Sequence, residues 1–132
     1  MYILSNRKQQ LTHWLLKANT ELGIDRTHVL EFIEYMQEKD NSILWIVRCI
    51  TALLYIRRQI DKPFVDWKKE DIKILFTWMD NKNYKASTHE KFRKILKIFY
   101  KVVFGKNEFH PETVNWFSTQ IGKDKKSQER DL

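Results

Sequence analysis

Apolar residues recur at steps of three and four along most of this 132-residue chain, in segments separated by short polar turns. Such spacing places apolar side chains on one face of an α-helix. The chain has only three glycines and two prolines, whereas a sheet protein needs many tight turns. The sequence therefore predicts an all-α fold, a bundle of five to six helices.

The apolar spacing and the residues that flank it give approximate bounds for each helix. The expected ranges are 5–22, 25 or 26 to 39, 42–61, 66–80 and 87–105, with a short last helix within 110–121. We expect one domain over residues 1–121. The charged segment 122–132 is expected to be a disordered tail or the start of a linker.

Residues suited to capping mark the expected helix starts. Ser42 is an N-cap type. Asp66, with acidic residues just behind it, offers a capping oxygen and negative charge where the helix dipole favours both. Ser87 and Glu90 have the spacing of a capping box, and Pro111 suits the first turn of a short last helix.

Each predicted helix has an inward face. Ile74 and Trp78 add a second apolar edge to the fourth helix, which predicts neighbours on two sides. The main inward sets after the first helix are Val29, Phe32, Ile33 and Met36; Ile43, Ile46, Val47, Ile50, Leu53 and Leu54; Ile72, Leu75, Phe76 and Met79; Phe92, Ile95, Leu96, Phe99, Val102 and Val103; and Val114, Phe117 and Ile121.

Catalytic and metal-binding patterns are missing from the sequence. Four scattered histidines lack the spacing of a metal site, and isolated glycines cannot form a phosphate loop. His89 fits a helix first turn and His110 a cap before proline. We expect no catalytic residues, no metal, no cofactor and no small-molecule substrate.

The number of cysteines and the hydropathy of the chain indicate its cellular compartment. Cys49 is alone, so it cannot form an internal disulfide, and it lies in an apolar helical pattern that predicts a packing role. No apolar run is long enough to span a bilayer, and the first residues do not resemble a signal peptide. A cytoplasmic protein without a membrane partner is expected.

Positive charge is concentrated in the fifth predicted helix. The chain carries 24 Lys plus Arg against 17 Asp plus Glu, a net charge of +7 that favours polyanionic partners. Seven basic residues and one acidic residue lie between Lys85 and Lys106. Arg93, Lys97 and Tyr100 are predicted to form a stripe facing away from the core.

The third predicted helix has a second basic face. It combines arginine forks with hydroxyl groups, which donate to phosphates and base edges. Together the two helices are expected to flank a groove. The predicted DNA-binding residues are Arg48, Thr51, Tyr55, Arg57, Arg58, Lys85, Ser87, Thr88, Lys91, Arg93, Lys94, Lys97 and Lys101.

Two other interpretations of the basic helices stay open. The segment KFRKILKIFYKVVFGK is similar to basic amphipathic helices that lie on membranes or enter calmodulin-like grooves. Its apolar residues are, however, needed as core partners by the other helices. The second interpretation is a helical protein-interaction domain whose partner has an acidic or helical surface.

Residues 26–117 carry a family resemblance. A long helix ending in basic residues, the link KPFVDW, the segment KEDI…LFTWM and the segment NYKASTHEKFRKILKIFYK follow one another. This order resembles the N-terminal core-binding domain of tyrosine recombinases, the phage-type integrases, and most closely the archaeal ones. The resemblance implies a SAM-like helical bundle that clamps double-stranded DNA together with a separate catalytic domain.

The resemblance also bears on residues and activity. It implies DNA contacts from Arg48, Thr51, Tyr55 and Arg58 in the third helix, and from Lys85, Thr88, Lys91 and Lys94 around the fifth. The family's catalytic His-x-x-Arg motif does not occur in this sequence. We therefore expect a non-enzymatic fragment of an integrase, with the C-terminal catalytic domain of the same polypeptide as its partner.

Overall fold

The structure is a computed structural model that describes residues 9, 11, 13 and 23–121. Its described residues form four α-helices and two short 3₁₀ turns, without a strand, so the all-α prediction is confirmed for them. Apart from positions 9, 11 and 13, which are helical, the predicted first helix lies outside the described residues, as does the predicted tail 122–132.

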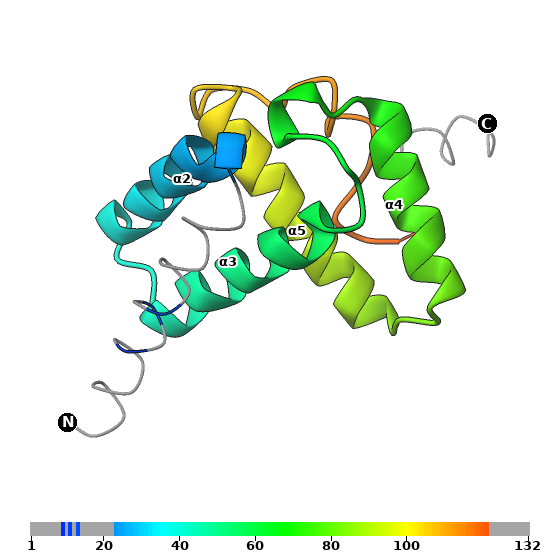
Figure 1. The fold of residues 1–132 in the computed structure, drawn as a ribbon, viewed down its shortest axis with the longest axis horizontal. Helices are drawn as coiled ribbons and strands as arrows, with labels where there is room; N and C mark the ends of the chain where they lie inside the picture. Colours follow the sequence, from blue (N-terminus) through cyan, green and yellow to red (C-terminus); the bar gives the residue numbers. More distant parts are fainter. Residues whose placement is uncertain (1–8, 10, 12, 14–22, 122–132) are drawn as a thin grey trace. The chain divides into compact units, whose positions relative to one another are not determined.

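The chain divides into two compact units, the first ending at Pro63 and the second beginning at Phe64. The first contains the 3₁₀ turn η1 (Gly23–Asp25) and the helices α2 (Arg26–Glu38) and α3 (Ile43–Arg57) (Figure 1). The second contains the 3₁₀ turn η2 (Phe64–Asp66), the helices α4 (Lys69–Asn81) and α5 (Ala86–Val103), and a non-helical segment to Ile121. The single domain over residues 1–121 stays a prediction.

The α2–α3 connection in the first unit follows the sequence closely. The predicted apolar face of α2 is buried throughout. Asp40 adopts a left-handed conformation with φ of 57°, and the Asn41 side-chain amide donates to the Met36 carbonyl. Ser42 then caps α3, since its hydroxyl oxygen accepts a hydrogen bond from the Trp45 amide at 3.1 Å. Both the N-cap and the start of α3 are confirmed.

An ion pair links the last turn of α3 to η1. Arg57 Nε donates to Asp25 Oδ2 at 2.7 Å, and its Nη1 donates to the Ile60 carbonyl at 2.9 Å. The Asp25 side chain is fully buried, while that of Arg57 is 22% exposed. A buried carboxylate without a cation would be strongly unfavourable, so Arg57 stabilises the fold of this unit.

Helix α4 begins later than the sequence suggested. Asp66 is not its cap, because it belongs to η2 and the N-cap position is Lys68. The carboxylate at the helix start is Asp71, which accepts a hydrogen bond from the Lys68 amide at 2.9 Å. The predicted inward residues of α4 are buried, but Ile74 is 60% exposed, so the expected second buried edge is wrong there.

Helix α5 begins at Ala86, and Lys85 occupies the N-cap position without a side-chain cap. The predicted capping box of Ser87 and Glu90 is therefore wrong. The Glu90 carboxylate instead accepts a hydrogen bond from the Ile121 amide at 3.1 Å. The helix ends two residues before Gly105, where a side chain would overlap the Phe109 carbonyl oxygen.

The predicted sixth helix does not form. The Val114 and Asn115 amides both donate to the Pro111 carbonyl, which closes one turn. Beyond it, side chains of α5 take the Phe117 and Ser118 carbonyls as acceptors. Val114 and Phe117 are nonetheless buried as predicted, whereas Ile121 is 43% exposed. We call residues 111–121 the C-terminal segment.

Replacing Asp25 by Ala should destabilise the protein by about 3–5 kcal/mol, because it leaves the Arg57 guanidinium partly buried without its carboxylate. Urea unfolding followed by circular dichroism measures the change. Asp61 is exposed, and its replacement by Ala should change the unfolding free energy by less than about 0.5 kcal/mol. Equal effects of the two substitutions would contradict a structural role for the pair.

Candidate nucleic-acid interface

The outward side of α5 carries an exposed basic face. Lys91, Lys94 and Ser87 are exposed and Lys101 is half-buried. At about 100° per residue these four positions fall within an arc of roughly 80°. Lys85, at the N-cap position, is also exposed. We call Ser87, Lys91, Lys94 and Lys101 the α5 basic face.

Arg93 lies on a different side of α5 from the one predicted. It is only 5% exposed, and its guanidinium carbon lies 4.4 Å from the ring centroid of Phe76 and 5.7 Å from that of Phe117. Its Nη1 donates to the Ser118 carbonyl at 3.0 Å. The predicted outward orientation of Arg93 is wrong, because the C-terminal segment packs over it.

Lys97 and Tyr100 continue this side of the helix. The half-buried Lys97 donates through Nζ to the Phe117 carbonyl, and its Nζ lies 5.0 Å from the Phe117 ring centroid. Tyr100 is 2% exposed and donates through its hydroxyl to the Phe64 carbonyl at 2.6 Å. The predicted outward stripe is therefore wrong. Arg93, Lys97 and Tyr100 face inward, and each donates a hydrogen bond to a backbone carbonyl of the same unit.

Thr88, in the first turn of α5, is the remaining predicted DNA-binding residue of the second unit. Thr88 is half-buried, beside the buried His89. His89 Nδ1 lies 3.5 Å from Asp80 Oδ1, and its ring packs edge-on against Phe76 at 5.0 Å between centroids. His89 is therefore a buried residue of the first turn of α5, and its predicted position in that turn is confirmed.

In the first unit, α3 presents three predicted residues on one side. Arg48 and Tyr55 are exposed and Thr51 is half-buried, all within an arc of roughly 60°. The Thr51 hydroxyl donates to the Val47 carbonyl at 2.7 Å, so its proton is not offered outward. Arg58, the C-cap residue, is exposed, whereas Arg57 lies on the opposite side with Asp25.

The two basic faces belong to different units of the chain. The α3 set lies before Pro63 and the α5 basic face lies after Phe64. That they flank one groove stays a prediction.

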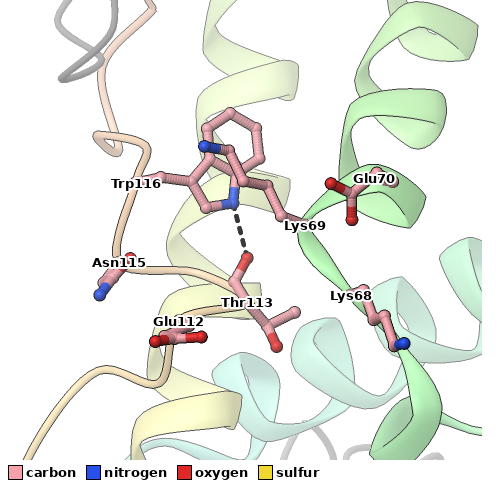
Figure 2. A pocket seen from close by; sticks show the side chains of 7 residues that line it. All are labelled: Lys68, Lys69, Glu70, Glu112, Thr113, Asn115 and Trp116. Atoms are coloured by element: carbon pink, nitrogen blue, oxygen red, sulfur yellow. Dashed lines mark hydrogen bonds between the residues drawn. The ribbon is translucent and has the colours of Figure 1, made fainter.

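Sequence reasoning missed a pocket in the second unit, of about 590 Å³ (Figure 2). Trp116 Nε1 donates to the Thr113 carbonyl at 2.7 Å, which fixes the indole. The ammonium groups of Lys69 and Lys73 lie 5.4 and 5.8 Å from its ring centroid. The four-residue spacing of these lysines was the available sequence signal. The pocket residues are Lys68, Lys69, Glu70, Glu112, Thr113, Asn115 and Trp116.

The lining of this pocket is balanced in charge. Two lysines face two glutamates, so it lacks the excess of cations that phosphate groups favour. The α5 basic face has three lysines, and one carboxylate, Glu90, lies beside it on the same helix. Of the two places, the α5 basic face is the better candidate for a polyanion.

Within residues 23–121 and the three helical positions before them, no group of three or more metal-ligating side chains gathers. In the same part of the chain, the helices are too short or too polar to cross a bilayer.

His110 lies at the edge of the basic residues of α5. Partial burial lowers the pKa of its imidazole, and the positive charges of Lys97 and Lys101 lower it further. A hydrogen bond with the Lys97 backbone acts in the opposite direction. The folded protein therefore holds the His110 proton less tightly than the unfolded chain does.

Because folding lowers this pKa, His110 makes folding less favourable as pH falls through the unfolded value of about 6.5. Replacing His110 by Gln should reduce the stability lost between about pH 7.5 and about pH 5. Urea unfolding of both proteins at the two pH values measures the difference. A variant that loses as much stability as the unchanged protein would show that His110 does not carry this effect.

Comparisons of the chain with protein-family models, with curated proteins and with solved structures gave no match.

Proposed function

We propose that this protein is a non-catalytic DNA-binding module that holds duplex DNA through exposed basic helix faces. The observation that carries the proposal is the α5 basic face, where Lys91, Lys94 and Lys101 share one outward side of a helix. The family resemblance in residues 26–117 supports the same assignment. Under this proposal the chain is a SAM-like bundle of the integrase core-binding type.

The lysines of the α5 basic face suit phosphate contacts. An ammonium group on a flexible stem can follow the DNA backbone without requiring one base sequence. The one acidic residue on α5, Glu90, accepts a hydrogen bond from the Ile121 amide and keeps its negative charge beside this face. The three lysines outnumber it, so binding through this face should depend strongly on salt.

The α3 face offers different chemistry. Arg48 presents an exposed planar fork, which can donate two hydrogen bonds to a guanine edge or a phosphate. Tyr55 and Arg58 are exposed beside it. We assign phosphate contacts to α5 and the more directional contacts to α3.

The rest of the proposal concerns the parent protein. A core-binding module would act with a catalytic domain on the same polypeptide, in the cytoplasm, and would not cut DNA itself. Arg57, Arg93 and Lys97 are removed from the proposed contacts, since each is held by a fold interaction.

A protein-interaction domain with an acidic partner is the alternative. Such a domain would use the same exposed lysines, so the charge of these residues alone does not distinguish a protein partner from DNA. Duplex DNA differs from an acidic protein in its condensed counterions, whose release makes log affinity fall linearly with log salt, by a slope that counts the phosphate contacts. That dependence distinguishes the two.

Replacing Lys91, Lys94 and Lys101 together by Gln should weaken duplex DNA binding and reduce the magnitude of the log–log salt slope by about 2.7, at about 0.9 for each lost phosphate contact. Stability should change little, since exposed charges contribute little to folding. Fluorescence anisotropy with a labelled duplex at several salt concentrations measures both quantities.

The matched control replaces Lys39, Lys62 and Lys106 by Gln, which removes the same charge from exposed positions outside both faces. It should leave most of the affinity. If the control variant loses as much affinity as the α5 variant, binding depends on the net charge of the protein and not on the α5 basic face. If the unchanged protein does not bind duplex DNA at low ionic strength, the proposed function is wrong.

A further inference from the structure

The outer side of α4 carries an exposed stripe that the DNA-binding proposal does not use. Glu70, Ile74, Trp78 and Lys82 follow one another at four-residue steps, from the second residue of the helix to its C-cap. Ile74 is 60% exposed and Trp78 is half-buried. A shallow groove of about 380 Å³ runs beside them, lined by Lys73, Ile74, Thr77, Trp78 and Asn81. We call Glu70, Ile74, Trp78 and Lys82 the α4 stripe.

The order of residues in the α4 stripe is acidic, apolar, apolar, basic. Over twelve residues at about 1.5 Å each, the two charges lie about 18 Å apart along the helix. The stripe winds through about 120° of the helix surface, so two stripes align when the helices cross at an angle of roughly 50°. With the stripes antiparallel, Glu70 of each copy then lies toward Lys82 of the other, and Ile74 toward Trp78. The stripe is therefore complementary to itself in both charge and hydrophobicity.

From this pattern we propose that the α4 stripe is a self-association surface, on which a second copy of the chain docks with its own α4 antiparallel. A two-fold axis between Ile74 and Trp78 would relate the copies, so that every contact occurs twice. A parallel arrangement is disfavoured because it would place Glu70 opposite Glu70 and Lys82 opposite Lys82.

Two charged neighbours of the stripe, Lys73 and Asp80, have interactions within the second unit. The Lys73 ammonium group lies 5.8 Å from the Trp116 ring centroid and is thus directed toward the C-terminal segment. Asp80 Oδ1 lies 3.5 Å from His89 Nδ1, on another side of α4. The Lys82 ammonium lies 5.9 Å from the Trp78 ring centroid, so it already lies at the end of the stripe.

The expected association is weak. One helix stripe covers less area than the roughly 1,200–2,000 Å² that stable complexes bury. A weak contact still matters on DNA, because two modules bound to one duplex meet at a high effective concentration. Self-association itself does not depend on DNA, so it can be tested without it.

Sedimentation equilibrium of the full chain, without DNA and up to about millimolar concentration, is the test. We expect reversible dimers. Ile74→Lys should weaken the dimer at least about tenfold, since it places a charge in the apolar centre of each copy. Phe109 is 56% exposed in the same unit, and the control Phe109→Lys should leave the dimer unchanged. Circular dichroism checks that both variants fold.

Charge reversals test the antiparallel arrangement. Glu70→Lys and Lys82→Glu should each weaken the dimer, because each creates a like-charge pair twice, and the double variant should restore it. A chain that is monomeric at every concentration would overturn the proposal. The α4 stripe would not be the dimer contact if Ile74→Lys left the dimer unchanged or if Phe109→Lys abolished it. Failure of the double reversal to restore the dimer would also contradict the antiparallel arrangement.

Discussion

Two hydrogen bonds from α5 to the C-terminal segment determine which cations of the second unit are available to a partner. Arg93 donates to the Ser118 carbonyl and Lys97 to the Phe117 carbonyl. The segment is held against this side by the buried residues Val114 and Phe117. The remaining lysines of α5, Lys91, Lys94 and Lys101, therefore lie on the outward side of this helix, where a polyanion can reach them.

Arg57 shows the same division in the first unit. Its guanidinium holds the buried carboxylate of Asp25, while Arg48 and Arg58 stay exposed. In both units, cations close together in sequence serve different purposes, according to whether the fold supplies them with a buried acceptor. Basic residues cannot be assigned to a DNA surface from charge alone, because a cation held by a buried acceptor contributes to stability and only an exposed one is available to a partner.

Helix positions and inward faces could be predicted because both follow from local apolar spacing, as the buried sides of α2 and α4 show. The errors arose where contacts distant in sequence compete with local preference. Glu90 accepts from the Ile121 amide instead of closing a capping box, and Arg93 and Lys97 take carbonyls that a sixth helix would have used. The pairing of Arg57 with Asp25, 32 residues away, likewise leaves no local signal.

The central claim is that DNA meets α5 on the side of Lys91, Lys94 and Lys101, which adjoins the side covered by the C-terminal segment. Chemical-shift mapping by NMR with a short duplex at low salt tests it most directly. The account predicts the largest backbone shifts at these lysines, with little change at the Arg93 guanidinium or the Trp116 indole. Shifts concentrated at Arg93 and Trp116, or no shifts at all, would contradict it.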